Sequence, residues 1–193
     1  MKKQNYLLDL MKLKQTVFTT KDISLVWNTD NSLFLKEKLY RYKKSNKIFR
    51  IRKGIYSKDE NFDKNEFATK IFTPSYISFE TVLAREGLIF QYYSQIFVAS
   101  YQAKSLNVLN QEYVYRKIKD EILINIAGIE NNRNYCIATK ERAFLDRIYI
   151  NKNFYFDNLS VLNWDKVFDL LPIYNNKSMQ KTVNKYYKDS KND

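Results

Sequence analysis

Apolar residues recur at helical spacing in three short segments near the start of the chain. This periodicity predicts helices over about residues 4–14, 19–27 and 31–45, the second of them opening on a capping-box-like threonine and aspartate three residues apart. Residues 48–58 then change to the residue types of a β-hairpin, with Gly54 at the turn. The expected order is therefore three helices followed by a hairpin.

The rest of the chain mixes helical and strand periods. Residues 57–64 are charged and show no hydrophobic pattern, so we expect a boundary there between a domain of residues 1–60 and a domain of residues 61–193. In the second domain the pattern predicts strands at 96–99, 113–118 and 135–138, and helices from about residue 79 to Gly87, at 139–150, at 164–171 and at 176–188.

Positive charge is concentrated in the first 60 residues, which hold 15 Lys/Arg and 6 Asp/Glu, a net charge of +9. The other 133 residues hold 18 and 15, a net charge of only +3. A basic segment with three helices and a Gly-tipped hairpin has the element order and charge of a winged helix-turn-helix, which binds the DNA backbone. The predicted fold class is α+β, with an N-terminal winged helix-turn-helix followed by a mixed α/β domain.

In a helix-turn-helix, the second helix of the pair lies in the major groove, and a hairpin wing can reach the minor groove. The residues that we expect to contact duplex DNA are Asn31, Ser32, Lys36 and Tyr40 at base edges; Lys43 and Lys44 at phosphates; Thr20 and Lys21, whose backbone N–H groups would anchor a phosphate; and Arg50, Arg52 and Lys53 in the wing. The alternative is an ordinary solvated basic face on a small helical domain.

The chain contains no histidine and one cysteine. It therefore lacks the commonest general base and zinc ligand, which excludes a zinc finger and Cys/His catalysis. We expect Cys136, which lies in an apolar run, to be a small buried hydrophobic residue. An alternative that stays open is a Mg²⁺-dependent nuclease built from Glu80, Glu86 or Asp146, although these acids form no paired motif. The leading expectation is a protein without catalytic residues, metal or cofactor.

No apolar run approaches the roughly 18 to 20 residues that a membrane-spanning helix needs. The N-terminus begins with Met1 and two lysines, as a signal peptide can, but Asp9, Lys12 and Lys14 interrupt the apolar stretch. We therefore expect a cytoplasmic protein without a membrane partner.

Four segments carry a resemblance to a known family. They are Val17–Ile23, Arg52–Tyr56, Ser75–Leu83 with Gly87 and Leu88 after it, and Ala138–Asp146, in that order. With them the chain resembles the AbiEi antitoxins of the AbiE type IV toxin–antitoxin and phage abortive-infection systems, over about residues 4–150. It departs from the family at Lys140–Ala143, where the family often has Pro-Glu-Lys-Ala.

The resemblance implies a two-domain protein whose winged helix represses its own operon at inverted repeats. It also implies that the C-terminal domain neutralises a nucleotidyltransferase-type toxin, without an obligatory stable complex. Two alternatives remain: a stand-alone winged-helix regulator, and a second domain that sequesters the toxin directly.

Two features of the second domain have more than one interpretation. Glu141, Arg142 and Asp146 are candidates for the antitoxin function, but we prefer a structural interpretation. In it, Glu141 favours the helix N-terminus and Arg142 pairs with Asp146 at i,i+4 spacing, worth a few tenths of a kcal/mol. Residues 113–119 alternate aromatic and basic side chains, which predicts an exposed strand with a charged edge or a second nucleic-acid contact.

Overall fold

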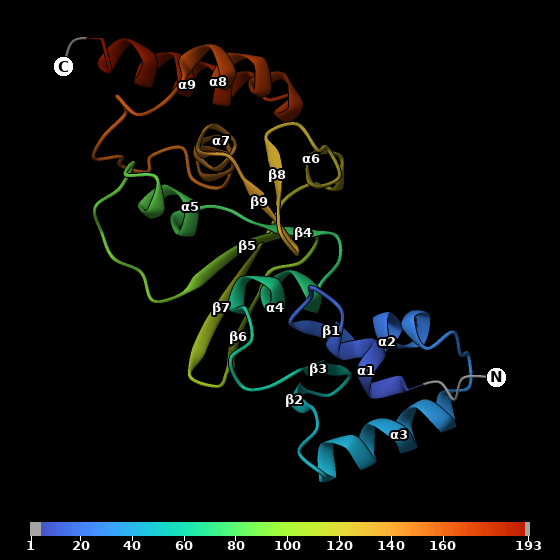
Figure 1. Ribbon diagram of the computed structural model, residues 1–193. Helices are drawn as coiled ribbons and strands as arrows, with labels where there is room; N and C mark the ends of the chain where they lie inside the picture. Colours follow the sequence, from blue (N-terminus) through green and yellow to red (C-terminus); the bar gives the residue numbers. More distant parts are fainter. Residues whose placement is uncertain (1–4, 192–193) are drawn as a thin grey trace. The chain divides into compact units, whose positions relative to one another are not determined.

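The computed structural model of the 193-residue chain describes residues 5–191 and combines helices with two β-sheets, an α+β architecture (Figure 1). The chain divides after Ile71 into two compact units, which we call unit 1 and unit 2. The boundary expected after residue 60 is therefore placed too early. The difference is an additional helix that belongs to unit 1.

Unit 1 is made of four helices and three strands. They are α1 (Tyr6–Met11), β1 (Val17–Thr19), α2 (Thr20–Val26), α3 (Ser32–Lys44), β2 (Phe49–Arg52), β3 (Ile55–Ser57) and α4 (Lys64–Ile71). The strands form one antiparallel sheet in the order β1-β3-β2. The three predicted helices and the hairpin are confirmed, although α1 ends at Met11, and its expected start at residue 4 lies outside the described residues. Neither β1 nor α4 was predicted.

The core of unit 1 gathers around Trp27, whose side chain is 2% exposed. Its indole N–H donates a hydrogen bond to the backbone oxygen of Tyr6 at 2.9 Å, and the two rings are 5.3 Å apart. The other buried core residues are Leu10, Phe18, Ile23, Leu35, Leu39 and Ile48. The apolar periodicity of all three N-terminal helices is therefore used to build one core.

Helix α4 is attached to unit 1 through buried polar contacts. Glu66 is fully buried, and its Oε2 accepts hydrogen bonds from the backbone N–H of Thr16 at 2.9 Å and from the Thr16 hydroxyl at 2.7 Å. Lys70 pairs with Asp22 of α2 at 2.8 Å. The apolar side of α4 is short, with Phe67 and Ala68 fully buried. These contacts explain why the division of the chain follows Ile71.

Unit 2 contains a six-stranded mixed sheet and the remaining helices of residues 5–191. Its elements are β4 (Ser75–Ile77), α5 (Glu80–Arg85), β5 (Ile96–Ser100), β6 (Lys104–Val108), β7 (Gln111–Lys117), α6 (Asp120–Leu123), β8 (Ile129–Asn132), β9 (Tyr135–Ala138), α7 (Lys140–Ile150), α8 (Trp164–Leu170), the 3-10 helix η1 (Leu171–Tyr174) and α9 (Lys177–Asp189). The strand order is β6-β7-β5-β4-β9-β8, and the pairs β5–β7 and β4–β9 are parallel.

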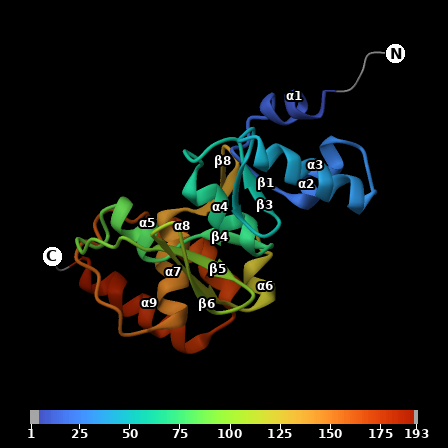
Figure 2. The same cartoon turned by 90° about the horizontal axis from the view of Figure 1, so that it is seen from below.

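Helix α7 is the central helix of unit 2 and contacts α5, α8 and α9 (Figures 1 and 2). Its apolar residues Phe144, Leu145 and Ile148 are fully buried. Thr139 caps its first turn by accepting a hydrogen bond from the backbone N–H of Arg142 at 3.3 Å. The helix predicted at 139–150 is thus confirmed together with its cap.

Two expectations for unit 2 are wrong. Cys136 is exposed, because alternate residues of β9 point to opposite faces of the sheet and its neighbours Tyr135 and Ile137 take the inner face. Strand β7 is not an edge strand, since it pairs with β6 on one side and β5 on the other. Tyr113 and Tyr115 are at most 1% exposed, so these two rings are part of the core and not available to a nucleic acid.

Within residues 5–191, no helix combines the length and the apolar character needed to cross a bilayer.

Candidate nucleic-acid interface

A groove of about 420 Å³ opens on unit 1 between α3 and the β2–β3 hairpin. Its lining residues come from α2, α3 and the hairpin: Thr20, Lys36, Leu39, Tyr40, Lys43, Arg50, Lys53, Gly54 and Tyr56. Four of the nine are cationic and none is acidic. Leu39 and Tyr56 contribute apolar surface, so the groove combines positive charge with a partly apolar wall.

Helix α3 supplies one side of the groove through residues at i, i+4 and i+7, namely Lys36, Tyr40 and Lys43. Tyr40 is 64% exposed, so its ring and hydroxyl are accessible at the groove. The opposite face of the helix is used differently. Lys38 lies over the rings of Tyr6 and Phe34, at 5.0 and 5.9 Å from their centroids, and so covers the core of unit 1.

Asn31 fixes the start of α3. Its side-chain oxygen accepts hydrogen bonds from the backbone N–H groups of Leu33 at 3.1 Å and Phe34 at 3.0 Å. The oxygen that we expected at a base edge is thus occupied as a helix cap.

The hairpin supplies the other side of the groove. Gly54 has φ of +81°, a conformation that a side chain would strain, and this permits the tight turn between β2 and β3. The backbone oxygen of Gly54 accepts hydrogen bonds from the Thr20 backbone N–H at 2.9 Å and from the Thr20 hydroxyl at 3.1 Å. The tip of the hairpin is therefore held at the start of α2.

This contact corrects one expectation. The N–H of Thr20 was expected to anchor a phosphate, but it already donates to Gly54 within the protein. Thr20 therefore positions the hairpin, and only the accompanying Lys21 retains the role that was expected of the pair.

A second, smaller hollow of about 220 Å³ lies at the turn between α2 and α3, and Lys21, Asn31 and Ser32 line it together with Thr20. Thr20 lines both hollows. Of the eleven residues expected to contact DNA, Lys44 and Arg52 line neither. Gly54 and Tyr56 line the groove but were not selected as contact residues, although both lie in the segment Arg52–Tyr56 that carries the resemblance.

The three antitoxin candidates of unit 2 are buried. Arg142 and Asp146 have no exposed surface, and Glu141 is 3% exposed. The expected i,i+4 pair is present, with Arg142 Nε 3.4 Å from Asp146 Oδ1. Neither residue can form a toxin-directed surface in this structure. The small energy of a solvated pair does not apply to them either, because both charges have been removed from water.

A network of hydroxyl groups surrounds Asp146. Its carboxylate accepts hydrogen bonds from Tyr174 at 2.6 Å, Ser78 at 2.7 Å and Tyr76 at 3.0 Å. Burial raises the pKa of both tyrosines well above its usual value, and the nearby Asp146 charge raises it further. Both phenols therefore stay protonated and act as donors.

Arg142 connects three parts of unit 2. Its guanidinium donates to the backbone oxygens of Ala127 at 2.8 Å and Ile122 at 2.7 Å, besides its pairing with Asp146. Burial lowers its pKa, but the oxygens of Tyr174, Asp146 and Tyr76 outweigh this effect and raise it, so Arg142 remains charged. For Asp146 burial is the largest effect and raises its pKa, against the opposing influence of Arg142 and the hydroxyl donors.

The acids considered for a Mg²⁺ site have other partners. Glu80, 3% exposed, binds Arg116 at 2.9 Å and Arg147 at 3.0 Å. Glu86 pairs with Arg85 at 2.9 Å. Within residues 5–191, no group of three or more His, Cys, Asp or Glu side chains is arranged to hold a metal ion. Glu80, Glu86 and Asp146 are thus engaged with separate arginines.

Comparison with known proteins supports the fold only. A scan against protein-family models and a search of curated proteins gave no match. Among solved structures, the chain is similar to the RV2827C protein from Mycobacterium tuberculosis, with a TM-score of 0.54 and 10% sequence identity. The similarity covers 95% of this chain and 75% of that chain. At this level of identity it extends to the mixed α+β architecture and not to an activity.

Proposed function

We propose that unit 1 is a winged helix-turn-helix that binds double-stranded DNA through the groove between α3 and the β2–β3 hairpin. The observation that carries the proposal is the gathering of Lys36, Lys43, Arg50 and Lys53 around one hollow, from a helix and a hairpin that are separate in sequence. On a basic face that is merely solvated, there is no reason for cations from a helix and a hairpin to line the same hollow. Helix α3 would enter the major groove, and the hairpin would lie against the adjacent backbone.

The roles follow from position. Lys36 and the exposed Tyr40 occupy the N-terminal and middle part of α3 and would reach base edges. Lys43, Arg50 and Lys53 would bind phosphates. Because the Thr20–Gly54 hydrogen bonds hold the hairpin in place, little ordering should be needed when DNA binds.

The test compares two charge-neutralising variants on the same helix. Lys36→Gln removes a cation from the groove, whereas Lys38→Gln removes one from the opposite face. Measured by mobility shift, Lys36→Gln should weaken binding to the protein's own promoter and reduce the preference for that promoter over random duplex, because Lys36 is assigned to a base edge. Lys38→Gln should leave both unchanged. Equal effects of the two variants, or equal affinity of the wild type for random duplex, would contradict the proposal.

We further propose that the whole chain acts as an AbiEi-type antitoxin, an autorepressor at inverted repeats that neutralises a nucleotidyltransferase-type toxin without catalytic activity of its own. The four segments of the resemblance support this. In unit 1, Val17–Ile23 and Arg52–Tyr56 meet at the Thr20–Gly54 hydrogen bonds. In unit 2, Ser75–Leu83 and Ala138–Asp146 meet in the buried network of Tyr76, Ser78 and Asp146. Within each unit, the two segments of the resemblance are thus joined to each other by hydrogen bonds.

A co-expression assay tests the antitoxin proposal. If the adjacent reading frame encodes a nucleotidyltransferase-like toxin, the wild-type chain should restore growth of cells that express it. Lys36→Gln should lose repression of the promoter but still restore growth, because repression is assigned to unit 1 and neutralisation to unit 2. Failure of the wild type to restore growth would leave only the stand-alone regulator.

A further inference from the structure

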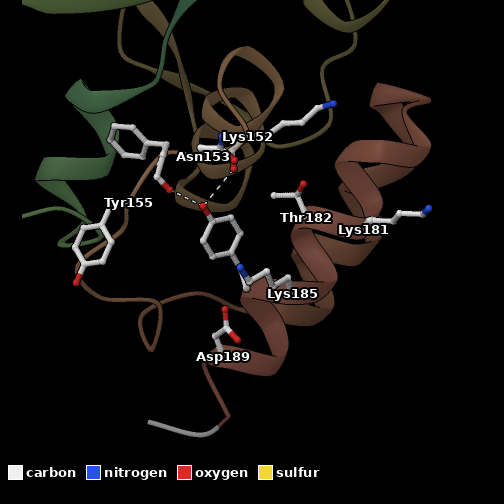
Figure 3. Close-up of a pocket in the computed structure, with 9 residues that line it drawn as sticks. Lys152, Asn153, Tyr155, Lys181, Thr182, Lys185 and Asp189 are labelled. Carbon is white, nitrogen blue, oxygen red and sulfur yellow. Dashed lines mark hydrogen bonds between the residues drawn. The ribbon is translucent and has the colours of Figure 1, made fainter.

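A further hollow, of about 510 Å³, lies on unit 2 between α9 and the loop of residues 152–155 (Figure 3). Helix α9 contributes Lys181, Thr182, Lys185, Tyr186 and Asp189, and the loop contributes Lys152, Asn153, Phe154 and Tyr155. Three of these nine side chains are cationic and one is acidic.

The positive charge of this hollow is not neutralised within the described part of the chain. Lys152 donates to the Ser178 hydroxyl at 2.8 Å, a neutral partner, and neither Lys181 nor Lys185 takes part in any of the ion pairs formed by residues 5–191. In Figure 3 the side chains of Lys152 and Lys181 extend outward at the rim. An anion that follows the rim would therefore meet ammonium groups contributed by the loop and by α9.

One exposed aromatic ring borders this hollow, and two others lie in a neighbouring loop. Tyr155 is 77% exposed, and with Phe154 it also lines a neighbouring hollow of about 260 Å³ that includes Phe90, itself 74% exposed. Tyr92, in the same loop as Phe90, is 85% exposed. Tyr155 thus joins the basic hollow to the adjoining hollow of Phe90, and two exposed rings in this arrangement point to a ligand with flat apolar faces.

Hydrogen bonds fix the backbone of the two loops that carry these rings. The backbone N–H of Phe90 donates to the Asp157 carboxylate at 2.8 Å, and the N–H of Asp157 donates to the Leu88 oxygen at 2.9 Å. On the α9 side, the Tyr186 hydroxyl donates to the backbone oxygen of Phe154 at 2.5 Å. The two loops and α9 therefore form one fixed platform.

We propose that this platform binds single-stranded nucleic acid, with unpaired bases stacked on Tyr155 and Phe90 and the phosphate backbone along Lys152, Lys181 and Lys185. Stacking requires bases that are free of a partner strand, and the combination of aromatic rings with a basic track is typical of single-strand binding. Two adjoining hollows that share Tyr155 suit a chain of several nucleotides better than a single nucleotide. The site uses none of the residues assigned to the duplex groove of unit 1.

Fluorescence anisotropy with labelled oligo-dT and oligo-U of about 12 nucleotides tests the proposal on the full-length chain. The Lys181→Gln/Lys185→Gln double variant should lower the salt slope of single-strand binding by about 1.4, since each lost phosphate contact removes about 0.7. A matched double variant, Lys104→Gln/Lys117→Gln, removes two exposed lysines from β6 and β7 and should leave the slope unchanged. Circular dichroism checks that all variants remain folded.

The aromatic contact has its own pair of variants. Tyr155→Ala should weaken binding about fivefold or more, whereas Tyr155→Phe, which keeps the ring, should bind as the wild type does. Lys36→Gln should weaken duplex binding and spare this single-strand binding, so that failure of the duplex proposal can be told from failure of this one. No binding of either oligonucleotide, equal loss in both double variants, or no effect of Tyr155→Ala would overturn the assignment. Binding of a protein partner at this surface, without binding of the oligonucleotides, would also overturn it.

Discussion

At the scale of single residues, the pair Arg142–Asp146 carries the largest electrostatic consequence. Both side chains are fully buried, and the guanidinium and the carboxylate each depend on the other and on neighbouring oxygens and hydroxyls for compensation. Removing a charged group from water costs several kcal/mol, and only close pairing offsets this cost. Replacing one partner by a neutral residue therefore costs more stability than replacing both partners.

The first prediction follows from this pairing. Asp146→Asn should destabilise unit 2 by about 3–5 kcal/mol, because it leaves the Arg142 charge buried without a counter-charge. The double variant Arg142→Met/Asp146→Leu should be closer to the wild type than the single variant is. Urea titration followed by far-UV circular dichroism measures both. A double variant less stable than Asp146→Asn would show that the hydrogen bonds of Arg142 to Ala127 and Ile122 matter more than its charge.

The i,i+4 spacing of Arg142 and Asp146 could be predicted from the sequence, but their burial could not. Charged residues are rarely buried, so an arginine and an aspartate four residues apart are interpreted from the sequence as a solvated pair. The partners that make burial possible come from other elements, Tyr76 from β4 and Tyr174 from η1. Their convergence is a property of the tertiary fold.

At the scale of elements, the junction of β1 and α2 joins several parts of unit 1. Thr19 ends β1 and caps α2 by accepting from the Asp22 N–H at 3.1 Å, while the Asp22 carboxylate accepts from the Thr19 N–H at 2.9 Å. The same carboxylate pairs with Lys70 of α4. One side chain therefore both completes the capping box and attaches α4.

The second prediction concerns this aspartate and pH. Burial alone raises the pKa of Asp22, but the hydrogen bond and charge of Lys70 and the Thr19 N–H outweigh it, so the pKa lies below its usual value. Since the folded state favours the ionised form, this stabilisation is complete above about pH 5 and is lost as the pH falls through the lowered pKa. Asp22→Asn should reduce the stability at pH 7 and flatten its decline between about pH 5 and pH 3. Parallel stability profiles for the wild type and Asp22→Asn would contradict this, as measured by thermal melts at each pH.

Long periodic elements were predictable, whereas short elements depended on distant partners. Helix α3 has apolar residues over three turns and was expected within a residue of each end. Strands β1 and β4 have three residues each and are strands only because they pair with β3 and β5. Helix α4 was missed for another reason. Its inward face includes the buried Glu66, which breaks the apolar pattern.

The candidate groove was predictable in composition but not in shape. Charge clustering and the order of elements selected most of the residues that line it, including Lys36 and Arg50. Arg50 lines the groove and Arg52 does not, and a register shift between β2 and β3 falls between these two residues.

At the scale of the whole molecule, the division into two units determines where the chain can be cut. Unit 1 includes α4, whose Glu66 and Lys70 bind Thr16 and Asp22. A cut after residue 60 would remove these two partners together with the fully buried Phe67.

The third prediction is that a fragment of residues 1–71 folds cooperatively and is more stable than a fragment of residues 1–60. The reason is that only the longer fragment retains the bonds to Thr16 and Asp22 and the burial of Phe67. Thermal melts of the two fragments, followed by circular dichroism, make the comparison. Equal melting temperatures would place the boundary at residue 60 after all.

The chain has two tryptophans, and each unit contains one of them. Trp27 lies in the core of unit 1, whereas Trp164 packs against Phe144 and Tyr187 in unit 2. Each indole is thus a built-in optical reporter of its own half of the protein. With one of them replaced by phenylalanine, the emission of the other would show which half opens first in the intact chain, without any attached dye.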